Sequence, residues 1–383
     1  MTNFFRKITA LFVRFKDLTA IGASNIIVSA IGGLFWIVLA TLMDAEAYGE
    51  IGYYLSIASI VGVSATLGAS NTIMVYTAKG EKLQKSFLYL VGTSGIISSI
   101  IIFLLLQNLG VSIFVLGYVI FQLIISETLG KKLYIKYSKI IITQRVLMVG
   151  LALALFFGIG VDGVIIGIGL SFLPFSIIIY KNFNESKFSW LQLKEKKKFI
   201  ANSFTLDISK VFSGHIDKLI IAPIFGFAIL GNYYLGIQIF NLLIMLPGAA
   251  YYYTLPQDAS GRSNPKLKKV AYAGSGILAL LGIFLAPVLI PYLFPKFLDA
   301  IIVIQILSIA VVPKTVTFMY MSEFMGNEKV RTVVIGSLIF IAIQIPLIFI
   351  LGDLYGILGI ATSLVLASVA EAGYLVVIKR IRL

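Results

Sequence analysis

The 383-residue chain has no cysteine and a single histidine. The absence of cysteine excludes disulfides, thiol catalysis and thiolate metal sites, and a single histidine makes a histidine-based metal centre implausible. Charged residues are also scarce, at 13% against about 25% in soluble domains. With 59% hydrophobic residues and a mean hydropathy of +0.99, the chain is predicted to be an integral membrane protein. We expect neither a metal ion nor a cofactor.

Two further signals are missing from the sequence. The chain contains no phosphate-binding glycine loop of the ATPase type, so it encodes no ATP-driven motor. Its N-terminus lacks a short apolar core followed by a small-residue cleavage site, and we therefore expect no cleavable signal peptide. Residues Met1–Asp17 interleave apolar and basic side chains. This pattern is typical of a helix on a membrane surface or of a charged lead-in to the first spanning helix.

Long apolar runs dominate the chain. Runs of about 20 residues are long enough to cross a bilayer as helices, and here they recur at regular intervals up to the C-terminus. The sequence therefore predicts an all-α integral membrane protein with about 12 transmembrane helices. They are expected at residues 19–43, 50–77, 86–107, 111–130, 139–160, 162–181, 199–226, 229–255, 269–293, 299–322, 330–350 and 354–378.

The basic residues alternate between the two sides of this predicted topology. Every second connection is rich in lysine and arginine, and together these connections hold 26 of the 31 basic residues. By the positive-inside rule, both termini are predicted to be cytoplasmic, with the protein in the cytoplasmic membrane. The same bias explains the net charge of +14 without nucleic acid as a partner. The outer connections are too short to form a soluble active site, so the chain is not expected to be an enzyme.

The longest cytoplasmic connection divides the chain into two halves. We expect a six-helix bundle over residues 1–181, a cytoplasmic linker over residues 182–198 and a second six-helix bundle over residues 199–383. The segments Tyr53–Ile57 and Tyr233–Ile237 are similar, and each opens the second helix of its half. A parallel internal repeat predicts this placement, although one short match in so apolar a sequence also arises by chance.

The predicted helix at residues 199–226 carries five titratable side chains. A charged side chain at the centre of a membrane helix costs about 2.5–3.5 kcal/mol, so four of them facing lipid would cancel the stability of a typical fold. At about 100° per residue, these four charges fall on one side of the helix. The helix is therefore predicted to line a wet, charged cavity, the alternative being a structural set of ion pairs. The five residues are Asp207, Lys210, His215, Asp217 and Lys218.

The basic residues within the predicted helices are candidates for holding an anionic substrate group. Lys210 and Lys218 lie on the charged helix itself. Arg145 and Lys314 lie in two other predicted helices, one in each half. They add cations to the same cavity, or they snorkel towards the cytoplasmic interface.

The acidic residues and the histidine of the charged helix suggest ion coupling. Asp207 or Asp217 is a candidate for binding H⁺ or Na⁺. His215 titrates near neutrality and is a candidate reporter of protonation, whereas the plainer interpretation is a hydrogen-bonded core histidine.

Glutamates and tyrosines outside the charged helix have simpler interpretations. Three glutamates near cytoplasmic helix ends are expected to pair with loop lysines, and tyrosines at predicted membrane interfaces are expected to form an aromatic belt, with sugar stacking as the alternative. The glutamates are Glu127, Glu323 and Glu371, and the tyrosines include Tyr48, Tyr53, Tyr54, Tyr233 and Tyr234.

Two stretches resemble the polysaccharide-exporter (O-antigen flippase) family of the MATE-like transporter superfamily. Residues 39–76 are similar to that family's first outer loop and second helix, with an acidic-tyrosine-glycine step before a small-residue helix. Residues 215–260 are similar to its seventh-helix segment, in which an aspartate and a basic residue precede a glycine-containing loop. The residues that match this second pattern are Asp217, Lys218, Gly226, Gly231, Tyr233 and Pro256.

The resemblance implies two six-helix bundles around a central cavity and a flippase that works by alternating access. Its substrate would be an oligosaccharide linked to a polyprenyl (pyro)phosphate, for synthesis of cell-surface polysaccharide. Membrane lipid, H⁺ or Na⁺, and glycan polymerase or ligase proteins are the partners expected on this basis. The related lipid II flippases use arginines in the amino-terminal half of the cavity. The first helix here has no basic residue beyond its cytoplasmic end, which argues against a peptidoglycan precursor.

The alternative with the same architecture is a MATE-type antiporter that exchanges small cations or drugs for ions. Such a protein is expected to present uncompensated carboxylates to its substrate. In this sequence, four basic residues within predicted helices roughly balance the acidic ones, which favours an anionic substrate.

Overall fold

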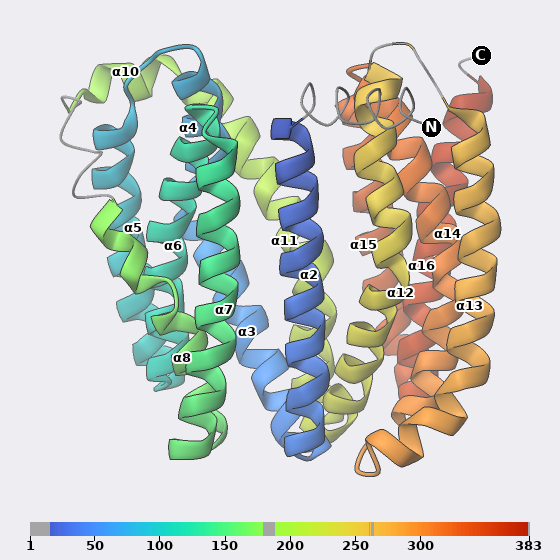
Figure 1. Ribbon diagram of the computed structural model, residues 1–383. Helices are drawn as coiled ribbons and strands as arrows, with labels where there is room; N and C mark the ends of the chain where they lie inside the picture. Colours follow the sequence, from blue (N-terminus) through green and yellow to red (C-terminus); the bar gives the residue numbers. More distant parts are fainter. Residues whose placement is uncertain (1–15, 179–187, 260, 262–263, 382–383) are drawn as a thin grey trace, which may run out of the picture. The chain divides into compact units, whose positions relative to one another are not determined.

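The protein is built of helices in the computed structural model, which describes residues 16–178, 188–259, 261 and 264–381 (Figure 1). No strand occurs in these ranges. Most of the amphipathic segment expected at Met1–Asp17 lies outside the described residues. The helices are α2 (Lys16–Leu42), α3 (Ala45–Ala65), α4 (Ala69–Ala78), α5 (Gln84–Leu106), α6 (Leu109–Gly130), α7 (Tyr134–Ile159), α8 (Val161–Leu170), the 3₁₀ helix η1 (Leu173–Phe175), α10 (Trp190–Glu195), α11 (Lys197–Phe225), α12 (Phe227–Ala259), α13 (Pro265–Leu293), α14 (Ala300–Gly326), α15 (Val330–Tyr355) and α16 (Ile357–Ile381).

The predicted all-α, multi-pass membrane fold is confirmed. Within the described ranges, 10 helices are long and apolar enough to cross a membrane, or 11 if α3 and α4, bent by 46° at their junction, form one span. Helix α11 has 29 residues but is not among them, because it carries the charged cluster predicted from the sequence. The cytoplasmic location of the termini stays a prediction.

The chain packs into two compact units. Unit 1 consists of the described residues up to Gly32 and of Ala58–Ile208, and unit 2 consists of Gly33–Ile57 and Ser209–Leu383. Helices α2, α3 and α11 therefore contribute residues to both units. The six-helix bundles with a linker at residues 182–198 stay a prediction.

In unit 1, α6 is the central helix and packs against α4, α5 and α8, while α7 packs against α8. Ile73, Phe87, Val91 and Leu123 are fully buried between these helices. Gly68 lies at the bend between α3 and α4 with a φ of +75°, and a Cβ atom there would collide with the backbone of α11. Glycine is therefore required at this position both for its conformation and for its lack of a side chain.

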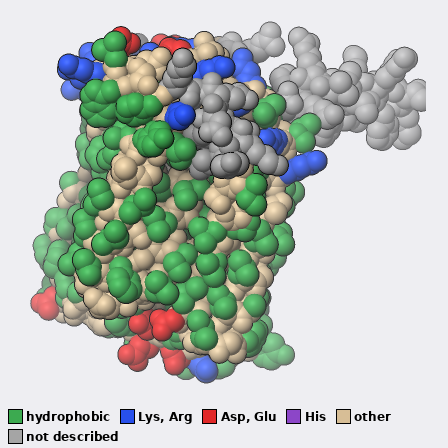
Figure 2. All heavy atoms as spheres, turned by 90° about the vertical axis from the view of Figure 1, so that its left-hand side faces the viewer, with side chains coloured by type: hydrophobic (Ala, Val, Ile, Leu, Met, Phe, Trp, Pro, Cys, Tyr) green, Lys and Arg blue, Asp and Glu red, His purple; other side chains and the backbone are tan. Residues whose placement is uncertain are grey.

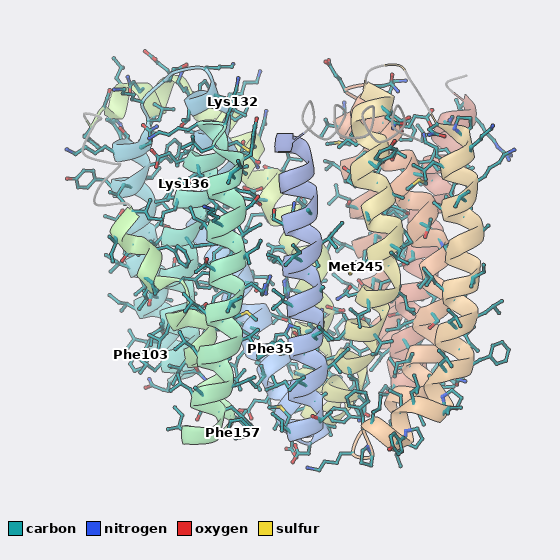
Figure 3. All side chains as sticks on the ribbon, viewed as in Figure 1. Phe35, Phe103, Lys132, Lys136, Phe157 and Met245 are labelled. Carbon is teal, nitrogen blue, oxygen red and sulfur yellow. The ribbon has the colours of Figure 1, made fainter. Side chains whose placement is uncertain are left out.

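Charged side chains are distributed unevenly over the face drawn in Figure 2. On the face in Figure 2, hydrophobic side chains cover the middle, Lys and Arg gather towards one end, and Asp and Glu dominate the other. Within unit 1, Lys132 and Lys136 lie towards the first end and Phe157 towards the opposite one (Figure 3). This is the pattern that the positive-inside rule describes for membrane proteins.

In unit 2, α14 packs against α12, α13 and α16, and α15 packs against α16. The core includes two tyrosines, Tyr48 and Tyr233, both 0% exposed, and Tyr234 is nearly as buried. Tyr48, Tyr234 and Trp36 form edge-to-face or tilted ring contacts with centroids 5.3–6.1 Å apart. The prediction that these tyrosines form an aromatic belt at the membrane interface is therefore wrong. Their rings pack inside unit 2, and the aromatic contacts stabilise this unit.

The beginnings of α3 and α12 cross closely within unit 2. A Cβ atom on Gly49 would collide with the carbonyl oxygen of Phe227, and one on Gly231 would collide with the carbonyl oxygen of Ala45. Each glycine thus lets the other helix's first turn approach its backbone, as small residues do in membrane helix packing. The contact is reciprocal, and each glycine lies shortly before one of the two segments whose sequences are similar.

Candidate functional site

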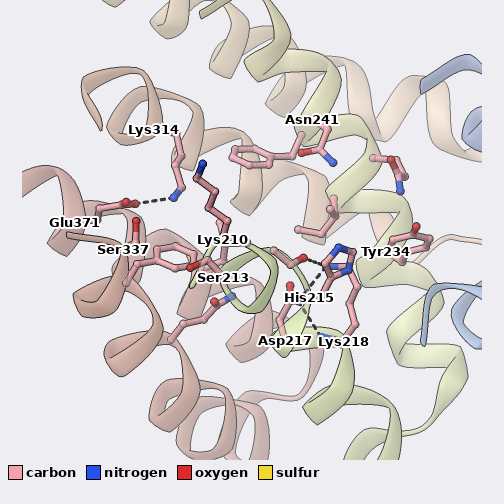
Figure 4. A pocket seen from close by; sticks show the side chains of 17 residues that line it. Lys210, Ser213, His215, Asp217, Lys218, Tyr234, Asn241, Lys314, Ser337 and Glu371 are labelled. Atoms are coloured by element: carbon pink, nitrogen blue, oxygen red, sulfur yellow. Dashed lines mark hydrogen bonds and ion pairs between the residues drawn. The ribbon is translucent and has the colours of Figure 1, made fainter. Parts of the chain in front are cut away.

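A cavity of about 490 Å³ lies within unit 2, between α11, α12, α14, α15 and α16 (Figure 4). Three lysines and two carboxylates line it, together with hydroxyl and amide groups and the rings of Tyr234 and Phe340. With a neutral histidine the cavity has an excess of one positive charge. Its polar and charged residues are Lys210, Ser213, His215, Asp217, Lys218, Gln238, Asn241, Lys314, Ser337, Gln344 and Glu371.

Asp217 and Lys218 are adjacent on α11 and form an ion pair, with each residue 4% exposed. Lys218 Nζ donates to Asp217 Oδ1 at 3.0 Å and to the carbonyl oxygen of Gly214 at 2.8 Å. The Tyr233 hydroxyl of α12 donates to Asp217 Oδ2 at 2.8 Å. Both carboxylate oxygens therefore have donors, and such hydrogen bonds help to offset the cost of desolvating a buried ion pair.

Lys314 and Glu371 form a second ion pair on the opposite wall of the cavity. Lys314 Nζ of α14 lies 2.7 Å from Glu371 Oε2 of α16 and 4.0 Å from the centroid of the Phe340 ring. A cation over an aromatic face gains a further electrostatic attraction. Glu371 is thus paired with a lysine of the cavity, and the prediction that it pairs with a loop lysine is wrong.

Lys210 differs from the other two lysines of the cavity. It is exposed, and it has no ion pair or hydrogen bond with any residue that the structure describes. Nearby, Gln344 is 1% exposed, and its Oε1 atom has no donor among the same residues. The cavity therefore offers one free ammonium group and one free amide oxygen to a ligand.

His215 faces the cavity from α11 and contacts α3. Its Nδ1 atom lies 3.2 Å from Ser56 Oγ, and Ser56 in turn donates to the carbonyl oxygen of Gly52 at 2.7 Å. Because that donation uses the serine proton, Ser56 Oγ is an acceptor for an Nδ1–H group of the histidine. The two predicted uses of His215, as a core hydrogen-bonding residue and as a reporter of protonation, both remain compatible with this contact.

Two of the seven predicted site residues belong to unit 1. Asp207 accepts a hydrogen bond from Asn71 Nδ2 of α4 at 2.9 Å. The Arg145 guanidinium of α7 lies against Gly32 of α2, and its Nη1 group approaches Met148 Sδ at 3.3 Å. Arg145 has no carboxylate partner in the described ranges, and its buried Nε–H group has no acceptor there. The other five, Lys210, Lys218, Lys314, Asp217 and His215, line the cavity of unit 2.

The remaining predicted pairings concern the helix ends. Glu127 pairs at 2.7 Å with Lys131, which follows α6, as predicted. Glu323 pairs at 2.6 Å with Lys379, which belongs to α16 and not to a loop. Sequence reasoning missed Tyr233 as the partner of Asp217 and Glu371 as a member of the cavity. The only available signal for Tyr233 was its place in the repeated Tyr-Tyr-Leu segment.

The fold has close counterparts among solved structures. The lipid II flippase MurJ, in an inward closed conformation, matches 94% of this chain and 87% of its own at 13% identity, with a TM-score of 0.77. An inward-facing multidrug resistance MATE family transporter of the MOP superfamily matches 95% of this chain and 94% of its own at 15% identity, with a TM-score of 0.70.

A third counterpart is a MOP superfamily transporter from Pyrococcus furiosus, described as having a binding pocket of reverse polarity that suggests a different function. It matches 96% of this chain and 95% of its own at 16% identity, with a TM-score of 0.65. No family model matches the chain, and no curated protein is similar to it in sequence. The protein therefore has the fold shared by MATE transporters and MurJ.

Proposed function

We propose that the protein is a flippase that moves an oligosaccharide linked to a polyprenyl (pyro)phosphate across the cytoplasmic membrane by alternating access, for synthesis of cell-surface polysaccharide. The observation that carries this proposal is Lys210, an unpaired ammonium group in a cavity whose other two lysines are neutralised. A cation without a carboxylate partner favours an anionic ligand. The (pyro)phosphate supplies that anion, and the polyprenyl chain remains in the bilayer.

The other groups of the cavity suit a sugar chain. Ser337, Asn241 and Gln344 offer hydroxyl and amide groups for hydrogen bonds with sugar hydroxyls, and Tyr234 offers an aromatic face. Such groups hold varied sugars without demanding one stereochemistry. This lining supports a substrate with an anionic end and a neutral, polar remainder.

Two features of unit 1 bear on the identity of the lipid-linked substrate. Arg145 is a cation of unit 1 without a carboxylate partner among the described residues, and its guanidinium group is suited to contact an anionic group. Helix α2, however, has no basic residue after Lys16. MurJ, described as a lipid II flippase, shares the fold. The arginines expected in the amino-terminal half of a lipid II flippase are absent from α2, which supports a glycan carrier over a peptidoglycan precursor.

We further propose that substrate movement is coupled to H⁺ or Na⁺ through Asp217, with Asp207 and His215 as further candidates. Protonation of Asp217 would release Lys218 Nζ from its 3.0 Å pairing and add a free cation to the cavity. Transport by Asp207→Asn/Asp217→Asn that keeps its dependence on a pH or Na⁺ gradient would contradict coupling through either aspartate. Asparagine is chosen because it retains a hydrogen-bond acceptor for Tyr233.

A MATE-type antiporter of organic cations is the second candidate. It is favoured by the multidrug resistance MATE transporters that share the fold and by the two carboxylates of the cavity. Each of these carboxylates already has a lysine partner within 3.0 Å, so neither is free to bind a cation without first losing that partner.

Transport in proteoliposomes separates the two candidates. A fluorescent polyprenyl-pyrophosphate oligosaccharide in the outer leaflet becomes protected from an added glycosidase only if it is flipped. We expect wild-type protein to protect it and Lys210→Gln to reduce the rate at least tenfold, with the exposed Lys296→Gln of the same unit as the matched control. Exchange of an organic cation for H⁺ or Na⁺ without any protection of the lipid would instead establish the antiporter.

A further inference from the structure

Unit 1 contains an apolar groove of about 470 Å³ that shares no residue with the cavity of unit 2. Its floor and walls come from α5, α10, α11 and the bend before α4. Among the residues that the structure describes, the charged members of its lining are two lysines, Lys194 of α10 and Lys197 of α11. The apolar residues that define it are Leu67, Leu90, Leu193, Ile200, Ala201 and Phe204.

The groove is held open by specific contacts of α10. Ser189, which caps the N-terminus of α10, exchanges two hydrogen bonds with Ser86 of α5 at 2.9 and 3.3 Å. Leu193 is buried in the core of unit 1. Lys196 anchors the junction of α10 and α11, because its Nζ atom lies 2.7 Å from Glu81 and 4.2 Å from the ring centroid of Tyr76.

The three neighbouring lysines at this junction have different electrostatic surroundings. The hydrogen bond that Lys196 donates to Glu81 raises the pKa of Lys196 and satisfies its charge. Lys194 and Lys197, which line the groove, have no carboxylate partner in the part of the chain that the structure describes. Their aliphatic stems lie along the apolar lining, and their ammonium groups are left for an external anion.

We propose that this groove binds an anionic phospholipid of the surrounding bilayer, with one acyl chain in the groove and its phosphate between Lys194 and Lys197. An apolar channel bordered by two unpaired cations is complementary to an amphiphile with an anionic head. Trp190, which is 62% exposed and lines the same groove, is the side chain that most favours the boundary between acyl chains and headgroups.

Trp190 also provides the means to test the proposal. The chain has two tryptophans, Trp36 and Trp190, so Trp36→Phe leaves Trp190 as the single fluorophore. This variant is reconstituted in phosphatidylcholine vesicles that contain a small mole fraction of a lipid brominated on its acyl chains, which quenches tryptophan on contact. We expect brominated phosphatidylglycerol to quench Trp190 at least threefold more than brominated phosphatidylcholine at the same mole fraction.

Two variants in the Trp36→Phe background locate the bound lipid. Lys194→Gln/Lys197→Gln is expected to abolish the excess quenching, whereas Lys132→Gln/Lys136→Gln removes the same charge outside the groove lining and is expected to preserve it. Ala201→Phe fills the groove while keeping both lysines, and it is expected to abolish the excess as well. If a folded Ala201→Phe variant keeps the excess quenching, the anionic lipid is held at the basic surface and not in the groove.

Two results would overturn the proposal. Equal quenching by the two brominated lipids would show that Trp190 contacts bulk bilayer without selection of an anionic head. Relief of quenching by unlabelled polyprenyl phosphate, with none by unlabelled phosphatidylglycerol, would assign the groove to the tail of the transported lipid. Thermal unfolding of each variant in detergent verifies that the protein is folded before its quenching is compared.

Discussion

In unit 2, Asp217 lies beside Lys218 and Lys314 lies 2.7 Å from Glu371, so the buried charges of the cavity form pairs. In unit 1, the Arg145 guanidinium has a thioether and a glycine as neighbours and no carboxylate partner among the described residues. Both arrangements occur within helices of a membrane fold, where isolated charge is expensive. We infer that the partners of a charge, more than its position in an apolar helix, determine whether it stabilises the fold.

Removal of one partner of the buried pair in unit 2 is expected to have the largest effect. Asp217→Ala leaves Lys218 buried and uncompensated and removes the acceptor of the Tyr233 hydroxyl, so it should lower the free energy of unfolding by about 3–5 kcal/mol. Thermal or denaturant unfolding in mixed micelles measures this change in the free energy of unfolding. The control is Asp217→Ala/Lys218→Met, which removes both charges and should recover most of the loss. If the double variant is as unstable as Asp217→Ala alone, the instability does not come from an unpaired Lys218, and the predicted role of the ion pair is contradicted.

The isolated charge of unit 1 is expected to behave in the opposite way. Arg145→Leu removes a desolvated cation whose Nε–H group has no acceptor among the described residues, so it should raise the free energy of unfolding by about 1–3 kcal/mol. On the proposed function, the same variant should also lose most transport, because unit 1 loses a cation proposed to contact the anionic substrate. Loss of stability on this substitution would show that the guanidinium has a stabilising partner and would remove the contrast between the two units.

Much of the fold was predictable because it follows from hydropathy. The apolar runs at residues 86–107 and 111–130 became α5 (Gln84–Leu106) and α6 (Leu109–Gly130), within two residues at every end. The charged helix was predictable for the same physical reason, since a membrane segment with several charges must face something polar. Five of its seven associated site residues line one cavity.

The parts that were not predictable depend on contacts between helices. The sequence places Glu371 near the end of a helix expected at residues 354–378. In the structure, α16 continues to Ile381 and α14 to Gly326, so Glu371 lies further from the helix end and contacts Lys314. Tyr233 was expected at a membrane interface because tyrosine is common there. Its hydroxyl has a buried carboxylate partner instead, and no one-dimensional pattern reveals such a partner.

Within unit 2, one substitution changes the charge of the cavity while nearly keeping the shape of the side chain. Glu371→Gln releases Lys314 from its carboxylate and raises the net charge of the cavity by one. We expect it to tighten binding of a short-chain polyprenyl pyrophosphate about tenfold, which corresponds to about 1.4 kcal/mol. Titration in detergent measures the affinity, and Glu323→Gln, at a helix end outside the cavity, is the matched control. Weaker binding by Glu371→Gln would show that the glutamate itself contacts the ligand.

The smallest effect is expected for the partly exposed pair of unit 1, Lys196 and Glu81, which serves as the counterpart of the buried pair in unit 2. A double-mutant cycle with Lys196→Gln and Glu81→Gln should give a coupling below about 1 kcal/mol that shrinks further at high salt. Because the hydrogen bond that Lys196 donates to Glu81 raises the pKa of Lys196, this contribution is fully present below the lysine's unfolded pKa and is lost as the pH rises through the raised value. The coupling should therefore be constant from about pH 6 to 9. A coupling free energy as large as that between Asp217 and Lys218 would mean that solvent around Lys196 does not screen the pair. The distinction between buried and exposed charge pairs in the two units would then no longer hold.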